Sequence, residues 1–149
     1  MLDTSPREQA LRPLPETVEE AEVLASGLRR ALETARASAQ PMAVLWGAEF
    51  RVLLNDGCRD VIGDVHPMVG GQPVAVAWSG LWEAAGHRME LALRGEASAM
   101  KSVPLEASRD GKRERLLYDM TFTPLAGEAG FTGGVLVTFT LLAEPVPFA

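Results

Sequence analysis

The stretch from Pro41 to Pro73 reads PMAVLWGAEFRVLLNDGCRDVIGDVHPMVGGQP, and it carries most of the local structural signals in the chain. Met42 to Gly47 is an apolar run that ends at glycine, and Phe50 to Leu54 is a second apolar run. Two such runs, separated by a few residues that include glycine, are typical of a β-hairpin. The sequence therefore predicts two antiparallel strands joined at Gly47-Ala48-Glu49.

A short capped helix is predicted directly after this hairpin. Asn55 or Asp56 can accept hydrogen bonds from the first free backbone N–H groups of a helix, and Gly63 ends that helix. Asp64 and His66 lie in the irregular connector that follows, where we expect their side chains to hydrogen-bond the backbone and hold the loop. These five residues are therefore predicted to have structural roles in turns and caps.

The pattern becomes helical and then strand-like beyond this stretch. Apolar residues recur at helical spacing over residues 81–93, which predicts the longest helix of the globular part. Alternating patterns predict three more strands, at residues 97–107, 113–123 and 131–142. Pro104 favours an edge position for the first of them, because proline has no N–H to donate to a neighbouring strand. Five strands with helices between the second and third indicate an α+β domain, an antiparallel sheet packed on one face by helices.

An amphipathic helix is predicted ahead of this domain, at residues 16–39, after a flexible tail at residues 1–15. Thr17 and Glu20 form a capping-box pattern near its start. Two interpretations of its narrow apolar stripe stay open. The stripe packs across the outer face of the chain's own sheet, or it pairs with the same helix of a second subunit. The stripe consists of Ala21, Leu24, Leu28, Ala31, Leu32 and Ala35.

Size, charge and cysteine content restrict the protein classes. The 149 residues suit one domain, at residues 41–142, with a tail or the start of a linker at residues 143–149. The formal net charge of −6 argues against nucleic acid and anionic membranes as partners. No apolar run approaches the roughly 20 residues that span a bilayer, and the N-terminus lacks a secretion signal, so we expect a cytoplasmic protein. The single cysteine excludes an internal disulfide and a zinc site built on several thiolates.

Several short motifs together resemble one known family, the PAS domains at the N-terminus of bacterial sensor histidine kinases. This resemblance implies a sheet of order 2-1-5-4-3, a homodimer formed through the flanking helix, and an output kinase domain or partner signalling protein. The kinase of such a phosphorelay, if present, would lie beyond Ala149. The motifs are LWG (45–47), LLND (53–56), IGD-x-HP (62–67), GGQP (70–73), Trp78 and LWEAAG (81–86).

A sensory rather than an enzymatic role follows from this resemblance. The sequence contains no phosphate-binding glycine loop, no nucleophile elbow and no His-Glu-x-x-His motif, so no catalytic residue is predicted. We expect an apolar pocket between the helix at residues 81–93 and the inner sheet face, either open to a small ligand or closed by its own side chains. Tyr118 is its expected polar group. The candidate lining residues are Trp46, Leu54, Trp78, Trp82, Met89, Tyr118, Met120, Phe122 and Phe139.

No cofactor is predicted. Cys58-Arg59 superficially resembles the Asn-Cys-Arg motif of flavin-binding PAS domains, but it lies in the first short helix and not at the later position of the reactive cysteine, which argues against a covalent flavin. His87 lies among polar residues of the long helix, off its apolar stripe, which argues against a haem ligand. An unidentified small ligand is still compatible with the sequence.

An alternative from another class is a stand-alone carrier or small enzyme. In this interpretation Asp64, His66 and Tyr118 surround an apolar cavity of a similar α+β fold. A deep pocket reached by at least two of these side chains would favour this alternative, whereas a filled core with an apolar outer sheet face would favour the sensory module.

Overall fold

An antiparallel sheet with the strand order β2-β1-β5-β4-β3 forms the centre of the molecule. The computed structural model describes residues 26–64, 70–127, 131–142 and 146–147. The sheet order is the predicted one, and Pro104 lies in the edge strand as expected. The strands are β1 (Met42–Trp46), β2 (Arg51–Leu54), β3 (Ser98–Arg109), β4 (Lys112–Ala126), β5 (Thr132–Leu141) and β6 (Val146–Pro147).

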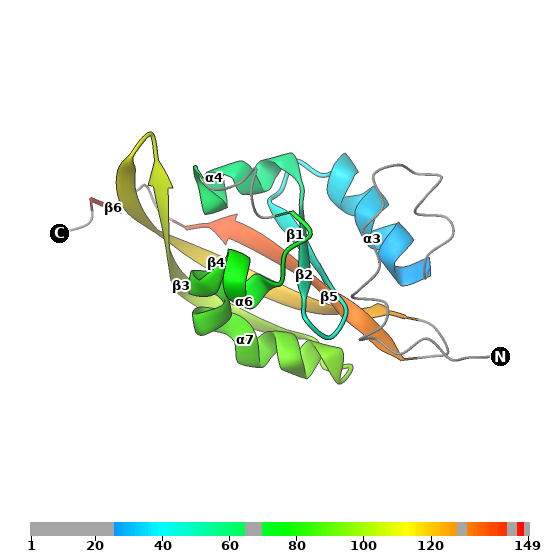
Figure 1. Cartoon of the computed structure of the whole chain (residues 1–149). Helices are drawn as coiled ribbons and strands as arrows, with labels where there is room; N and C mark the ends of the chain where they lie inside the picture. Colours follow the sequence, from blue (N-terminus) through cyan, green and yellow to red (C-terminus); the bar gives the residue numbers. More distant parts are fainter. Residues whose placement is uncertain (1–25, 65–69, 128–130, 143–145, 148–149) are drawn as a thin grey trace.

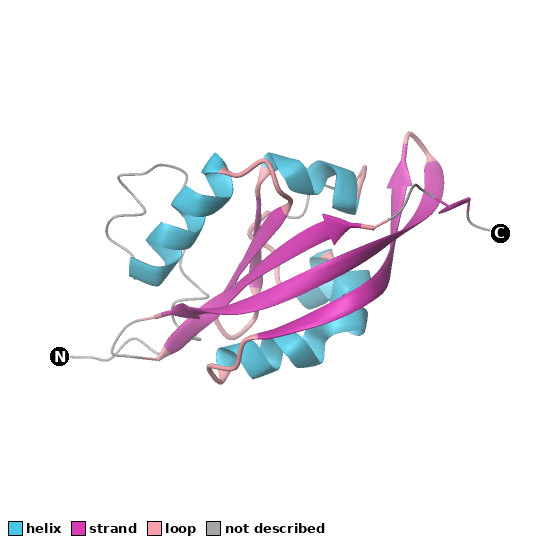
Figure 2. Ribbon diagram, turned by 180° about the vertical axis from the view of Figure 1, so that it is seen from behind, coloured by secondary structure: helices cyan, strands magenta, loops and turns pink. Residues whose placement is uncertain are grey.

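Helices lie on both sides of this sheet. Figures 1 and 2 show α6 and α7 together and α3 well apart from them. The helical elements are α3 (Ser26–Ala37), η1 (Asp56–Cys58), α4 (Arg59–Ile62), α6 (Val74–Ala77) and α7 (Ser79–Leu93). Within the described residues, no helix is long and apolar enough to cross a bilayer.

The β1–β2 and β3–β4 turns differ in conformation. Gly47 to Phe50 connects β1 to β2, so Phe50 is a turn residue with a positive φ of 52° and does not begin the second strand as predicted. Its buried ring lies 5.8 Å from that of Trp82, and this packing keeps the apolar residue in the turn. Asp110 and Gly111, with φ of 51° and 79°, form the two-residue turn between β3 and β4.

The long strands depart from the predicted pattern at two points. β4 continues through Pro124, which pairs with Val135, whereas the sequence predicts that Pro124 ends the strand. A bulge interrupts β3 between Met100 and Val103, and Ser102 there has a φ of 53°. The Asp119 carboxylate accepts a hydrogen bond from the backbone N–H of Ser102 at 3.0 Å, which fixes the bulge against β4. The two-residue β6, which was not predicted, pairs with β4 at Glu114 and Arg115.

The inner face of the sheet carries the larger core. The short helices and α7 pack on this face, and their apolar residues join those of all five long strands in one cluster. Burial of this much apolar surface is the main stabilising contribution to such a fold. Its largest fully buried side chains are Phe122, Phe139, Leu45, Leu81, Met89, Leu116, Met120, Val52 and Val61.

The outer face carries a smaller core beneath α3. Val44 and Trp46 of β1 pack there against the apolar stripe of α3. Two glycines permit the close approach: a Cβ on Gly27 would lie 1.9 Å from the carbonyl oxygen of Ala126, and a Cβ on Gly133 would lie 2.4 Å from the ring of Trp46. The start of α3 therefore lies directly on the end of β4, and the ring of Trp46 lies directly on β5.

Candidate functional site

Most of the predicted pocket residues lie on the inner face, where they fill the core. Met89, Met120, Phe122 and Phe139 are at most 1% exposed and pack with one another. Trp78 stacks on Phe139, with ring centroids 5.5 Å apart and an interplanar angle of 25°. Trp82 and Leu54 are half-buried at the edge of the same cluster.

Trp46 does not belong to this group, so its prediction as an inner pocket residue is wrong. Successive side chains of a strand point to opposite faces, and on β1 the buried Ala43 and Leu45 take the inner face. Val44 and Trp46 therefore point to the outer face, where they contact α3. β1 is apolar on both sides, so its pattern alone could not assign the tryptophan to a face.

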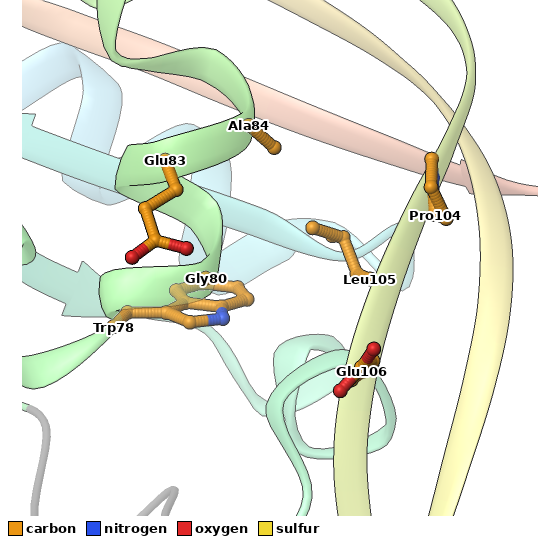
Figure 3. A pocket seen from close by; sticks show the side chains of 7 residues that line it. All are labelled: Trp78, Gly80, Glu83, Ala84, Pro104, Leu105 and Glu106. Atoms are coloured by element: carbon orange, nitrogen blue, oxygen red, sulfur yellow. The ribbon is translucent and has the colours of Figure 1, made fainter. Parts of the chain in front are cut away.

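A pocket of about 380 Å³ lies between the start of α7 and the edge strand β3. We call it the α7–β3 pocket, and Figure 3 shows the side chains around it. Trp78 is its one residue that the sequence predicted. Helical periodicity placed Glu83 on a polar face, and no local signal indicated that it would face β3. The pocket is lined by Trp78, Gly80, Glu83, Ala84, Pro104, Leu105 and Glu106.

Glu83 and Glu106 differ in their partners. Glu106 accepts hydrogen bonds from Arg113 at 2.7 Å and from Arg115 at 3.1 Å. These bonds, that of Arg115 first, lower the pKa of the Glu106 carboxyl below its ordinary value. Glu83 is exposed and has no hydrogen bond or ion pair within the described residues. The net negative charge at the pocket is therefore concentrated on Glu83.

A smaller crevice of about 150 Å³ lies on the other side of the sheet, between α3 and β2. It is lined by side chains that belong to the contact between the flanking helix and the sheet. It therefore marks an incompletely filled part of that contact. The lining residues are Leu32, Ala35, Arg36, Val44, Leu53, Leu54 and Asn55.

Asn55 joins α3 to the sheet, and it does not cap the following helix. Its side-chain oxygen accepts a hydrogen bond from the N–H of Met42 at 3.0 Å. Its amide nitrogen donates to the carbonyl oxygens of Gln40 at 2.8 Å, Ala35 at 3.0 Å and Ser38 at 3.4 Å. The predicted capping hydrogen bond is absent at η1, because the side chain is buried among these partners instead. Asn55 thus satisfies carbonyl groups at the end of α3.

The other four predicted turn residues differ in their contacts. Asp64 accepts hydrogen bonds from the N–H groups of Asp110 and Gly111 at 3.0 and 3.2 Å, so it holds the β3–β4 turn as the predicted backbone-binding residue. Gly63 ends α4 with a φ of 79°. Asp56 is exposed and pairs with Arg59 at 3.7 Å. His66 lies outside the described residues.

Tyr118 lies in the inner core, near Arg109. Its ring is 2% exposed and meets Phe139 edge-on at 6.1 Å. Burial raises the pKa of Tyr118 to about 12, although the charge of Arg109 and a hydrogen bond from it act in the opposite direction. Arg109 also donates to the backbone oxygen of Asp60, so the phenol belongs to the contact between the β3–β4 hairpin and α4.

Cys58 and His87, the two residues considered for cofactors, lie in different surroundings. Cys58 is fully buried, its thiol donates to the carbonyl oxygen of Met42 at 3.1 Å, and burial raises its pKa to about 12. Such a thiol is a poor nucleophile at neutral pH. His87 is exposed on α7. No group of three or more His, Cys, Asp or Glu suited to a metal ion occurs among the described residues.

The apolar stripe of the N-terminal helix lies against the chain's own sheet, as in the first of the two interpretations. Leu28, Ala31, Leu32 and Ala35 are at most 5% exposed and pack with the outer face of β1. Ala21 and Leu24 lie outside the described residues. Pairing of this stripe with a second subunit would require α3 to leave the sheet.

Comparisons with known proteins identify relatives only among solved structures. No family model matches the chain, and no curated protein matches it. The LOV protein of Rhodobacter sphaeroides aligns with a TM-score of 0.52 and 16% identity over 78% of this chain and 69% of that one. The PAS domain of a protein from Colwellia psychrerythraea aligns with a TM-score of 0.52 and 17% identity over 77% and 96%.

A third similar structure is a sensory box sensor histidine kinase from Vibrio cholerae. It aligns with a TM-score of 0.53 and 12% identity over 80% of this chain and 94% of that one. Likenesses at this level of identity concern the fold. They agree with the observed strand order and with helices inserted between β2 and β3.

Proposed function

Because the chain has the PAS fold, we propose that it is a sensory or regulatory module, the input domain of a sensor histidine kinase or a related signalling protein. Support comes from the sensory box sensor histidine kinase among the structures of the same fold. Fold alone does not determine function, so the weight of the proposal rests on how the two faces of the sheet are connected.

The observation that carries the proposal is the set of hydrogen bonds by which Asn55 connects α3 to β1. One buried side chain binds the end of α3 and the first residue of β1, four hydrogen bonds in all. β1 in turn contributes Ala43 and Leu45 to the inner core and Val44 and Trp46 to the core under α3. A change in packing on the inner face would therefore shift the strand on which α3 rests.

The mechanism we propose is a population shift between a docked and a released α3. A ligand or partner that contacts the inner side would favour one of the two states, and it could shift the equilibrium only by its difference in affinity for them. The contact of α3 suits such a switch because it is small and incompletely filled, as the crevice beside Asn55 indicates. The output, a kinase domain or a partner protein, would read the position of this helix.

Hydrogen exchange tests this role directly. Compounds that raise the melting temperature would first be selected from a metabolite library, since ligands stabilise the state that they bind. We expect those that bind on the inner side to change amide exchange within residues 26–37, and not only near their own site. Binding without any change in that segment would contradict the proposed transmission to α3.

Homodimerisation stays a prediction. The stripe expected to form the seam is buried on the chain's own sheet in the docked state. A dimer built on it would form when α3 is released, so we expect association to increase with release of the helix. Sedimentation velocity over a range of concentrations measures this association.

No observation among the described residues favours the carrier or enzyme alternative. Asp64 holds the β3–β4 turn, and Tyr118 is buried in the inner core. Neither side chain lines the α7–β3 pocket. We therefore propose no catalytic role for this chain and no resident cofactor.

A further inference from the structure

The α7–β3 pocket contains an unused hydrogen-bond donor held in a rigid position. Trp78 is 7% exposed and one side of its ring is stacked against Phe139, so the indole has little freedom to move. Within the described residues its N–H has no hydrogen-bond partner. Figure 3 shows the indole nitrogen on the side of the ring that faces β3. The indole N–H of a mostly buried tryptophan normally has a hydrogen-bond partner, so a ligand acceptor that reaches it through the pocket would complete the site.

This donor is accompanied by the carboxylate of Glu83, for which the described part of the chain supplies no partner. Figure 3 shows the Glu83 carboxylate pointing toward the indole of Trp78, with open space between them and Leu105. A cation placed there would meet the carboxylate and the electron-rich face of the indole together, two attractions that act in the same direction. The formal net charge of −6 also favours cations around the whole molecule.

The rest of the pocket restricts the size and shape of the ligand. Leu105, Ala84 and Pro104 supply apolar walls, and a Cβ at Gly80 would meet no atom within 4 Å. Glu106 does not compete for the cation, because Arg113 and Arg115 already occupy its oxygens. The volume of about 380 Å³ suits a small organic molecule.

We propose that the α7–β3 pocket binds a small organic cation, an amine with a hydrogen-bond acceptor a few bonds from its ammonium group. The ammonium contacts Glu83 and the face of Trp78, the acceptor receives the indole N–H, and the short carbon chain lies against Leu105. This inference rests on the proposed sensory role and names the class of signal molecule that the module detects.

The test uses 3-methoxypropylamine as the cationic probe, 3-methoxypropionate as its anionic counterpart and 1-methoxybutane as the uncharged one. The full chain has three tryptophans, so a ¹⁵N-labelled sample gives three indole N–H signals, and Trp78→Phe identifies the one from the pocket. We expect the amine to move the Trp78 signal in a saturable way, and the other two probes to leave it unchanged at the same concentration.

Matched variants separate the site from general attraction to an acidic protein. Glu83→Gln should weaken amine binding about tenfold or more, the effect of removing a charged hydrogen bond. Glu90→Gln, on an exposed glutamate of the same helix, should leave it unchanged. Gly80→Leu should block the pocket without a backbone clash. Equal shifts with the anion, equal weakening by both glutamine variants, or no amine binding at all would overturn the proposal.

These results can be distinguished from a failure of the sensory role. The titration reports binding in the pocket only, whereas hydrogen exchange in residues 26–37 reports transmission to α3. Binding of the amine with no response in α3 would support the site and contradict the sensory mechanism. A response of α3 to other ligands, with no amine binding, would support the sensory mechanism and contradict the amine site.

Discussion

The two faces of the sheet are built in different ways. The inner face joins five strands with α4, α6 and α7 through large interlocking side chains such as Phe122, Phe139 and Met89. The outer face holds one helix through a few aliphatic side chains, the ring of Trp46 and the hydrogen bonds of Asn55. The difference indicates that the inner core maintains the fold, whereas the outer contact can open while the sheet stays intact.

Replacing a buried leucine by alanine, once on each face of the sheet, should have the largest effect on stability. This pair of substitutions compares the two faces most directly. Leu45 on the inner face and Leu28 on the outer face are both at most 1% exposed. Leu45→Ala should lower the free energy of unfolding by about 3 kcal/mol, a typical cost of a core cavity. Leu28→Ala should mainly release α3 and leave most of the stability of the sheet. Urea unfolding, monitored by fluorescence, measures the stability of both variants, and hydrogen exchange measures the release of α3. Equal losses of stability in the two variants, with no selective increase of exchange in α3, would contradict the difference between the faces.

Two helical glycines provide the next comparison. Gly27→Ala places a Cβ 1.9 Å from the backbone oxygen of Ala126, so α3 must shift away from β4. Gly80→Ala meets no atom within 4 Å and should stabilise α7 by about 0.5–1 kcal/mol, because alanine favours the helix. Changes of the Trp46 indole signal would report the shift of α3. An unchanged Trp46 signal and unchanged stability in Gly27→Ala would show that the close contact is unimportant.

Asn55→Ala removes the hydrogen bonds that connect the end of α3 to β1. It leaves the carbonyl group of Gln40 and the N–H of Met42 without the partner that Asn55 gives them, at a cost of about 1–3 kcal/mol. We expect amide exchange in α3 to increase more than in α7. Asp56→Ala is the matched control, since its exposed carboxylate makes only a surface ion pair and should change stability by less than about 1 kcal/mol.

A change to alkaline pH has a modest effect near pH 10, and it acts through the inner side. The pKa of Cys58 is raised from 9.0 to about 12 by burial, so the native state keeps the neutral thiol while the unfolded chain ionises. This contribution is fully present below pH 9 and is lost as the pH rises toward 12, by roughly 1 kcal/mol at pH 10. Tyr118, with a pKa raised from 10.0 to about 12, adds to the loss above pH 10. Cys58→Ala should flatten the stability curve between pH 9 and 10; an unchanged slope would contradict this assignment.

Local patterns predicted the framework of this molecule well. The glycine between two apolar runs predicted the β1–β2 hairpin, and Pro104 predicted the edge strand. These features depend on the backbone preferences of single glycine and proline residues, which do not require contacts with distant parts of the chain. The strand order came from the resemblance to PAS domains and agrees with the structure.

The candidate site depends on contacts between distant residues, which local patterns do not specify. The partners of Asn55 lie 13 to 20 residues before it in the chain, where a local pattern does not reveal them. Its position directly before a short helix predicted a helix cap instead. Trp46 belongs to a strand that is buried on both faces, and periodicity cannot assign such a strand to one side. Glu83 acquires its place through the packing of α7 against β3.

Native-state hydrogen exchange, resolved by residue, tests the central claim most directly. If α3 is a separately released element, its amides will exchange through an opening of lower free energy than those of α7 and β5. In Asn55→Ala that free energy will fall further for α3 while the values for α7 change little. A single opening free energy shared by all three elements, lowered equally by the substitution, would contradict the claim.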